Sequence, residues 1–183
     1  MKNALHSCES VEWGTPFDVL ERVRRVIGTI DFDPATSDFF QSRVRPTYYF
    51  DKQSDGLTSK WPICEGVFLN PPGGKVGNKS MTTLFWNKLL ENRDKFAHAI
   101  FLAFSIEAAQ TTQSVSPEGT VAKGILAFPF CVPRKRLRFV DRNGDNRKAP
   151  THSSVIVYVP GRTNRSFQFM EVFAEMGVVR GQP

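Results

Sequence analysis

The stretch from Val67 to Lys75, Val-Phe-Leu-Asn-Pro-Pro-Gly-Gly-Lys, constrains the fold of this chain more than any other. Its three apolar residues indicate the end of a buried strand, and two consecutive prolines cannot donate hydrogen bonds to a sheet. The backbone must therefore leave the sheet at Asn70 in an extended conformation. The carbonyls of Asn70 and Pro71 and the Asn70 side-chain amide then lie beyond a strand end, which is where open α/β sheets bind ligands.

This cluster of acceptors suits the activation of an exocyclic amine on a nucleobase. Such an amine is a poor nucleophile because its lone pair is delocalised into the ring. Two acceptors that bind its N–H bonds favour a more tetrahedral nitrogen, and Asn70 and Pro71 supply two oxygens for that purpose. The same residues are also typical of a turn that only ends a strand, and this is the commoner meaning of such a short motif when it stands alone.

Length and composition indicate one domain. A chain of 183 residues that is 40% hydrophobic can bury a sizeable core, and we predict a single domain over residues 12–177 after a flexible tail over residues 1–11. No run of 18 apolar residues occurs, and residues 1–10 lack the apolar stretch of a signal peptide. We therefore expect no membrane partner and a cytoplasmic location. The three cysteines and three histidines form no cluster with metal-ligand spacing, so we expect free thiols and no bound metal.

The net charge of +6 is concentrated in one segment. Residues 134–148 contain seven basic residues and two acidic ones, which leaves +5. The basic residues are Arg134, Lys135, Arg136, Arg138, Arg142, Arg147 and Lys148. A turn at residues 141–145 is expected to project this charge outward, either as a solvated loop or as a phosphate-binding surface. We favour the second interpretation, with double-stranded DNA as the partner and Lys75 as a further contact.

The order of elements indicates an α/β fold. Helical spacing of apolar residues follows a cap at Thr15-Pro16 and ends at Gly28, and further helices are expected after Ser80 and Ser166. Strands are expected at 30–33, 43–50, 67–69, 97–104, 125–130 and 154–159, with a mobile glycine-rich segment at 73–80. Because strands alternate with helices first and flank the basic loop later, we predict a mostly parallel sheet with an antiparallel edge hairpin.

A carboxylate is expected at the end of the first strand. Ile30 and Phe32 alternate with Asp31 and Asp33, and Pro34 ends the run. At a strand end, Asp33 could bind the amine of an amino-acid-like ligand or hold a metal. An Asp before a Pro is also a common turn former.

Three motifs occur in a fixed order: Trp13-Gly-Thr-Pro before a helix, Asp31-Phe-Asp-Pro-Ala at a strand end, and Asn70-Pro-Pro. In these motifs the chain, from Trp13 to Val159, resembles the phage-encoded DNA adenine-N6 methyltransferases, which use S-adenosylmethionine. The stretch Asp55-Gly-Leu up to Trp61 is also similar to that family. The resemblance implies a Rossmann-like methyltransferase sheet with a reversed hairpin at one edge, in agreement with the pattern of elements.

The resemblance also implies the roles of individual residues. The catalytic loop would consist of Asn70, Pro71, Pro72 and Gly73, and the S-adenosylmethionine site of Trp13, Thr15, Pro16, Asp33, Ala35 and Asp55. The DNA contacts expected from the charge pattern are Lys75, Arg134, Lys135, Arg136, Arg138 and Arg142, with Phe139 as a stacking ring. The reaction would be an in-line methyl transfer to a base flipped out of the duplex, without a metal, by a monomer or weak dimer.

Two positions depart from the family pattern. Gly73 stands where the commoner motif has an aromatic residue that stacks on the flipped base, a contact worth about 1–3 kcal/mol per base. Candidates to replace this ring from elsewhere are Phe85, Trp86 and Phe104. The segment from Asp33 to Ser37 also lacks the glycines that usually let the backbone approach the cofactor.

Two other functions compete with DNA methylation. One is a non-catalytic DNA-binding protein on a methyltransferase fold, which the two departures favour. The other is a Mg²⁺-dependent nuclease that would use Asp31, Asp33 and Asp38, but this function leaves the Asn-Pro-Pro loop without a role.

Overall fold

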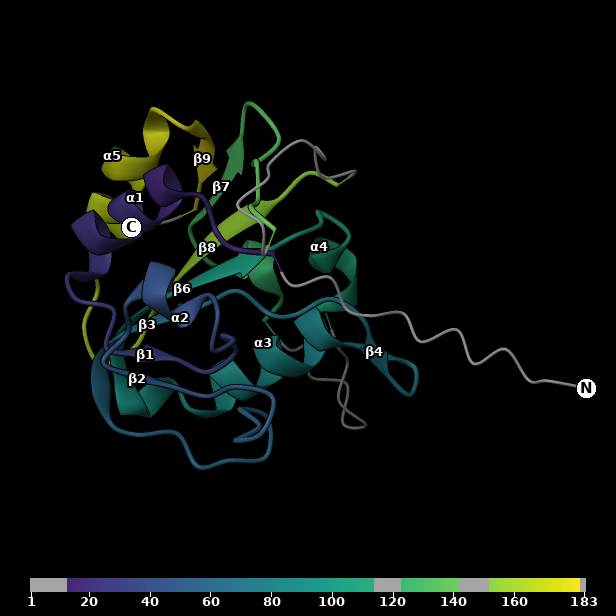
Figure 1. Cartoon of the computed structure of the whole chain (residues 1–183). Coiled ribbons are helices and arrows are strands. Elements are labelled where there is room, and N and C mark those ends of the chain that lie inside the picture. Colours follow the sequence, from purple (N-terminus) through teal and green to yellow (C-terminus); the bar gives the residue numbers. More distant parts are fainter. Residues whose placement is uncertain (1–12, 114–122, 142–151, 182–183) are drawn as a thin grey trace, which may run out of the picture.

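The structure is a computed structural model that describes residues 13–113, 123–141 and 152–181 (Figure 1). The helices are α1 (Phe17–Ile27), α2 (Gln41–Val44), α3 (Met81–Glu91), α4 (Ala108–Thr111) and α5 (Ser166–Ala174), with 3₁₀ turns η1 (Arg93–Lys95) and η2 (Ile125–Ala127). The strands are β1 (Phe32–Asp33), β2 (Tyr48–Tyr49), β3 (Cys64–Leu69), β4 (Lys75–Val76), β5 (Lys79–Ser80), β6 (Phe96–Ala103), β7 (Phe130–Pro133), β8 (Val155–Pro160) and β9 (Gly177–Arg180). The predicted tail, residues 1–11, lies outside the described residues.

Seven strands form one mixed sheet in the order β2-β1-β3-β6-β8-β7-β9. The pairs from β2 to β6 are parallel, and the pairs from β6 to β9 are antiparallel. The α/β class and the parallel half of the sheet confirm the prediction and are compatible with a Rossmann-like fold. The antiparallel pairing of β7 with β8 agrees with the predicted hairpin, but β9 forms the edge beyond it. The sequence pattern ends the last element at Gly177 and does not indicate this strand.

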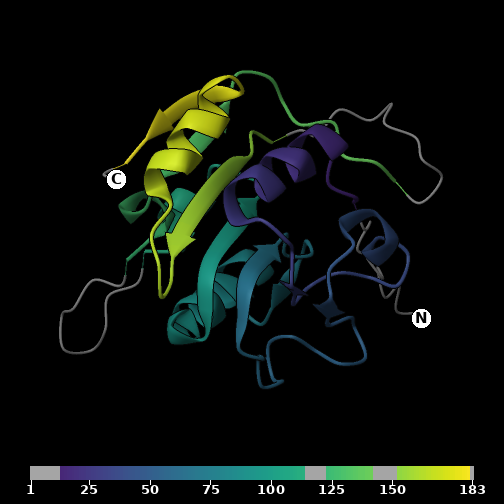
Figure 2. The ribbon, with the colours of Figure 1, turned by 90° about the vertical axis from the view of Figure 1, so that its left-hand side faces the viewer.

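Helices cover both faces of the sheet, which gives three layers (Figure 2). Side chains alternate along β3, so that Phe68 points into one core while Val67 and Leu69 point into the other. The first core lies under α1 and α5, and the second lies under α3 and η2. The central strand β6 is buried along its whole length, as expected for a strand covered on both sides. None of the described helices is long and apolar enough to cross a membrane.

Helix α1 follows the predicted pattern and buries Val19, Leu20, Val23, Val26 and Ile27. Its end at Gly28 is confirmed, because this glycine has φ of 79° and its N–H donates to the Arg24 carbonyl. The predicted cap is wrong in detail. The N-cap is Pro16, and no side chain caps the helix. The Thr15 hydroxyl instead accepts a hydrogen bond from the Asn70 side chain.

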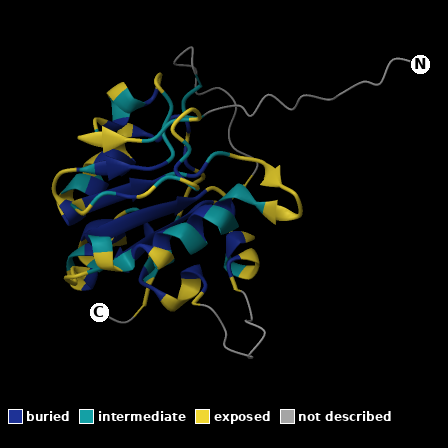
Figure 3. Ribbon diagram, turned by 90° about the horizontal axis from the view of Figure 1, so that it is seen from below, coloured by how far each residue is buried: buried dark blue, intermediate teal, exposed yellow. Residues whose placement is uncertain are grey.

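Three local predictions differ from the structure. The strand expected at 43–50 is limited to β2, because residues 43 and 44 end α2 and Arg45 has φ of 54°. The strand predicted over residues 125–130 is replaced by η2 at its start, and β7 begins only at Phe130. Pro129 explains the delay because it has no N–H to donate to a sheet, although its carbonyl accepts a hydrogen bond from the Tyr158 N–H at 2.8 Å. Residues 73–80 contain the β4-β5 hairpin, which the sequence pattern did not predict, with Gly77 at φ 57° in its two-residue turn. This exposed hairpin projects from the body of the molecule (Figure 3).

Candidate active site at the carboxyl ends of the parallel strands

The strand ends bring the second and third motifs of the sequence together. In the parallel register, Phe32 of β1 lies opposite Val67 of β3, so Asp33 is level with Phe68. Asn70 lies two residues further along the neighbouring strand, which is about 7 Å in the strand direction. Asp33 and Asn70 therefore occupy the same edge of the sheet, on adjacent strands. This is the edge at which open α/β sheets bind ligands.

The Asn70 side chain is oriented by the segment that precedes α1. Its Nδ2 donates to the Trp13 carbonyl at 3.4 Å and to the Thr15 Oγ1 at 3.2 Å. A backbone carbonyl can only accept a hydrogen bond, so the nitrogen of the amide must face Trp13. The Oδ1 atom is thereby directed away from these two groups, as an acceptor fixed in place. Trp13 and Thr15 thus act on Asn70 directly, which the sequence did not indicate.

The segment around Thr15 is itself held from two sides. The Arg43 Nε donates to the Thr15 carbonyl at 2.6 Å, and Gly14 exchanges two backbone hydrogen bonds with Val140 at 2.7 and 3.0 Å. A Cβ atom at Gly14 would overlap the ring of Phe40, so this close approach requires glycine. The motif at residues 13–16 is therefore a largely buried link between Asn70 and the end of the basic segment. Sequence reasoning misses Arg43 and Phe40 because nothing in their spacing pairs them with this motif.

Asp33 is a buried carboxyl group with few partners. It is 2% exposed, and its Oδ1 accepts a hydrogen bond from the Ala35 N–H at 3.1 Å. Burial raises the pKa of the Asp33 carboxyl to about 7, against hydrogen bonds from Ala35 and Thr36 that lower it. A strongly raised pKa at a strand end marks a candidate functional group, because a bound cation would stabilise the charged form.

The Asp55 loop packs directly on the turn after Asp33. A Cβ atom at Gly56 would overlap the Pro34 carbonyl oxygen, so the two backbones are in contact. Asp55 has φ of 43°, and its carboxylate accepts hydrogen bonds from the Leu57 N–H and the Thr58 hydroxyl, at 3.1 and 2.8 Å. The loop is thus close to the site, but the Asp55 carboxylate binds its own turn.

The other predicted residues of the site differ in accessibility. Pro16 and Pro71 are buried, Trp13, Ala35 and Pro72 are half-buried, and Gly73 is exposed. An added Cβ at Gly73 would meet no atom within 4 Å, so a side chain fits there without strain. In the loop after Asn70, Gly73 is therefore accessible from solvent, whereas Pro71 is not.

Of the three rings that are candidates for base stacking, burial leaves one. Phe85 and Trp86 are 3% and 0% exposed and belong to the core under α3. Phe104 is 39% exposed and directly follows β6, the neighbour of β3. Its ring meets the His152 ring edge-on at 5.8 Å. An accessible aromatic pair thus lies at the same edge of the sheet as Asn70.

The described part of the basic segment is anchored by two buried side chains. Leu137 and Phe139 enter the core under α1, while Arg136 and Arg138 beside them are exposed. Phe139 is 5% exposed, so the prediction that it stacks on a base is wrong.

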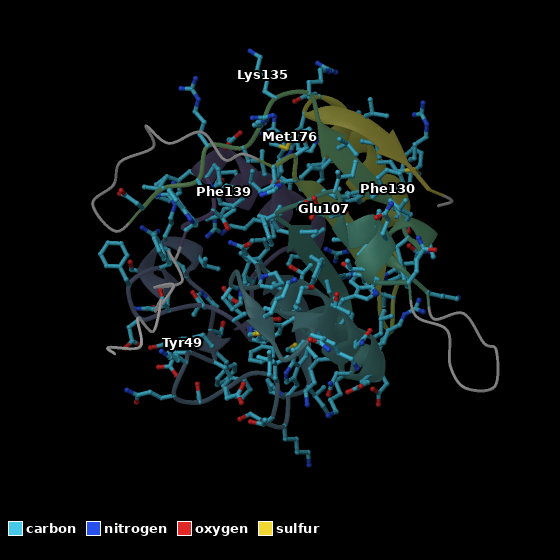
Figure 4. All side chains as sticks on the ribbon, turned by 90° about the vertical axis from the view of Figure 1, so that its right-hand side faces the viewer. Tyr49, Glu107, Phe130, Lys135, Phe139 and Met176 are labelled. Carbon is cyan, nitrogen blue, oxygen red and sulfur yellow. The ribbon has the colours of Figure 1, made fainter. Side chains whose placement is uncertain are left out.

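The start of the basic segment lies at the outer margin of the molecule. Arg134 and Lys135 are exposed, and Lys135 projects outward near Met176 (Figure 4). The Arg134 N–H donates to the Met176 carbonyl at 3.0 Å. The described cations of this segment are thus carried on a backbone that is held by hydrogen bonds at residues 134 and 140.

Some predicted DNA contacts cannot be placed. Arg142, Arg147 and Lys148 lie outside the described residues, as does most of the predicted turn at residues 141–145. Lys75 is exposed in the β4-β5 hairpin, which leaves the Asn70 loop and returns to α3. Its position beside the candidate catalytic loop is thus consistent with a DNA contact.

The carboxylates expected for a nuclease do not converge. The Asp31 Oδ2 accepts hydrogen bonds from the backbone N–H groups of Glu65 and Gly66, both at 2.9 Å, and so ties β1 to β3. Among the residues that the structure describes, no three acidic, histidine or cysteine side chains are grouped as metal ligands.

Two hollows occur among the described residues, and neither is lined by Asp33 or Asn70. The larger, about 710 Å³, lies at the opposite edge of the sheet, between β2 and the segments Lys60–Ile63 and Asp94–Lys95 that precede β3 and β6. The smaller, about 520 Å³, lies between the start of α1, the region of α2 and the end of the basic segment. The sequence gives no sign of either hollow.

Comparison of the sequence with models of known families and with curated proteins found no match.

Proposed function

We propose that this protein transfers a methyl group from S-adenosylmethionine to an exocyclic amino group in double-stranded DNA, most simply the N6 of adenine. The observation that supports this most is the fixed Asn70 amide. Its Nδ2 is bound by Trp13 and Thr15, and its Oδ1 faces away from them at a strand end. An acceptor held in this way can bind one N–H of the target amine without reorganisation during the reaction.

Asp33 is the proposed partner of the cofactor's ammonium group. It lies on the strand next to Asn70, and the groups that donate hydrogen bonds to its buried carboxyl group, Ala35 and Thr36, are uncharged. An ammonium group brought beside it would favour the carboxylate form and be bound in return. Asp33 would then hold the amino-acid end of the cofactor on the strand adjacent to Asn70.

The chemistry proposed for these residues needs no proton relay at the attacking nitrogen before the transfer. Bound S-adenosylmethionine would supply the methyl group, and its sulfur would keep the electron pair of the broken C–S bond and leave as S-adenosylhomocysteine. The nitrogen gains the methyl group and then loses a proton to solvent. Asn70 and the Pro71 carbonyl would bind the N–H bonds, and Phe104 would stack on the flipped base in place of a ring at position 73.

Replacement of Asn70 tests this proposal. The Asn70→Ala variant removes the oriented acceptor, so we expect labelled-methyl transfer to duplex DNA to fall by at least about 100-fold. Binding of S-adenosylmethionine, measured by isothermal titration, should change only a few-fold because the Asp33 side of the site is intact. A variant that keeps wild-type transfer, or a folded wild-type protein that binds no S-adenosylmethionine with or without duplex present, would contradict the proposal.

A non-catalytic DNA-binding protein is the second candidate. It is favoured by the Asp55 carboxylate, which is engaged within its own turn, and by the glycine at position 73, which offers no stacking ring. This function predicts salt-dependent DNA binding without cofactor binding. The nuclease function is not proposed, because the Asp31 carboxylate is already used to join two strands.

A further inference from the structure

The smaller hollow, about 520 Å³, has a composition suited to a planar ligand. Its volume lies in the range of about 300–1,000 Å³ that is usual for small-molecule sites. Its walls come from three separate parts of the chain: the start of α1, the residues around α2, and residues 140–141 of the basic segment. The aromatic and charged side chains of its lining include Phe17, Asp38, Phe39, Arg43 and Asp141.

Two of these side chains are rings that a ligand can reach. Phe17 is 55% exposed and Phe39 is 50% exposed. The Phe39 ring is supported edge-on by Phe40 at a centroid distance of 5.0 Å and an interplanar angle of 87°. Phe40 is buried against Gly14, so one face of the support is rigid. Phe39 therefore offers an exposed ring on a fixed base.

A guanidinium group completes the stacking surface. The Arg43 Cζ lies 3.6 Å from the centroid of the Phe17 ring, while its Nε donates to the Thr15 carbonyl at 2.6 Å. The side chain is thus held at two points within the wall of the hollow. Nucleobases stack both on aromatic rings and on guanidinium planes.

The charges of the hollow distinguish a base from a phosphate. Among the described residues that line the hollow, one cation, Arg43, is accompanied by two carboxylates, Asp38 and Asp141. Carboxylates repel a phosphate, and Asp38 can accept a hydrogen bond from the amino group of a base. The exposed cations Arg136 and Arg138 lie outside the hollow, on the part of the basic segment that precedes Asp141. A nucleotide could therefore place its base in the hollow and its phosphate on the basic segment.

We propose that this hollow is a second nucleobase site, which takes an unstacked base of the DNA strand close to the base held at Asn70. The two sites are joined through Thr15, whose carbonyl accepts from Arg43 and whose hydroxyl accepts from Asn70. The proposal rests on DNA as the partner in the proposed function, but not on methyl transfer. Occupation of the hollow would hold the strand open beside the candidate catalytic loop.

Affinity for single-stranded DNA tests the proposal. The Phe39→Ala variant loses the stacking ring, so its dissociation constant for a fluorescein-labelled 12-nucleotide single strand (about the length of one binding site), measured by anisotropy without cofactor, should rise about tenfold. The Phe39→Trp variant keeps a ring and should bind like the wild type. The matched control is Phe167→Ala, which removes a ring that is 72% exposed on α5, and it should leave the affinity unchanged.

Each outcome separates this site from the proposed activity. Wild-type affinity in Phe39→Ala, equal losses in Phe39→Ala and Phe167→Ala, or no binding of the single strand by the wild type would overturn the second nucleobase site. A protein that binds the strand through Phe39 but never transfers a methyl group would retain the site while the methyltransferase proposal fails. Methyl transfer by a protein whose affinity for the single strand is unchanged in Phe39→Ala would support the methyltransferase proposal and overturn the second nucleobase site.

Discussion

Asp33 is the residue at which stability and function most clearly oppose each other. A carboxyl group that is 2% exposed must either stay neutral or find a cation, and burial raises its pKa from 3.8 to about 7. At neutral pH this residue therefore costs stability in the absence of a ligand. A buried carboxyl group with a raised pKa is a candidate for binding a cationic ligand, which is the role proposed for it here.

The pH dependence of unfolding follows from this shift. The folded state keeps the Asp33 proton up to about pH 7, whereas the unfolded state loses it near pH 4, so the unfolded state binds fewer protons between these values. Stability from this residue is thus fully present below pH 4 and is lost as the pH rises to 7. At about 1.4 kcal/mol per unit, the wild type should lose about 3 kcal/mol between pH 5 and pH 8 relative to Asp33→Asn. Urea unfolding of both proteins at several pH values measures this difference, and parallel profiles would contradict it.

At the scale of elements, the sequence predicted what local chemistry determines. Helix α1, the cap of α3 by Ser80 and the buried strands β3, β6 and β8 all follow from apolar spacing and capping residues. The strand that the sequence did not predict, β9, is decided by a distant contact. Strand β9 exists because Gly177 to Arg180 pairs with β7, and a Cβ at Gly177 would overlap the Val132 carbonyl oxygen. A short polar and apolar stretch after a helix carries no local sign of that partner.

The contact between the Asp55 loop and the β1 turn gives a prediction at this scale. In Gly56→Ala the new methyl group would overlap the Pro34 carbonyl oxygen, which is backbone and cannot rotate away. We expect a loss of about 1–3 kcal/mol in unfolding free energy, as for other overpacked sites. Weaker S-adenosylmethionine binding should accompany it because the loop and the Asp33 turn are pushed apart.

The matched control is Gly73→Ala. A Cβ at Gly73 meets no atom within 4 Å, so the unfolding free energy should stay within about 0.5 kcal/mol of the wild type. Urea unfolding of the wild type, Gly56→Ala and Gly73→Ala measures the change in unfolding free energy of each variant. Equal stability of Gly56→Ala and Gly73→Ala would mean that the two turns are not in firm contact.

At the scale of the whole molecule, the site depends on which elements the fold brings together. The residue pattern indicated Asp33 and Asn70, the family resemblance added Trp13 and Thr15, and the sheet does place Asp33 and Asn70 on adjacent strand ends. It could not show that Asn70 is bound by Trp13 and Thr15, because 55 residues separate the two hydrogen-bonded side chains. The burial of Phe139 was equally hidden, since one ring in a basic segment has no periodic partner to mark it as core.

The basic segment extends the same edge of the molecule. The bridge between Gly14 and Val140 holds residue 140 of the basic segment beside the motif that binds Asn70. The exposed cations at residues 134–138 precede that bridge in the chain. A duplex bound along these cations would therefore pass the candidate catalytic loop. If the protein binds DNA as proposed, charge concentrated at this edge would guide the duplex toward Asn70.

Salt dependence of DNA binding measures this arrangement. Replacing Lys135 and Arg138 by Gln removes two exposed cations, so the slope of log affinity against log salt should decrease in magnitude by about 0.9 for each phosphate that is no longer neutralised. The control carries the same change of charge at Arg25 and Lys60, which are exposed toward the opposite edge of the sheet. If duplex affinity were governed only by net charge, both double variants would show the same decrease. A decrease confined to the Lys135 and Arg138 variant requires a DNA path along the basic segment, and equal decreases would reject that path even if the protein binds DNA tightly.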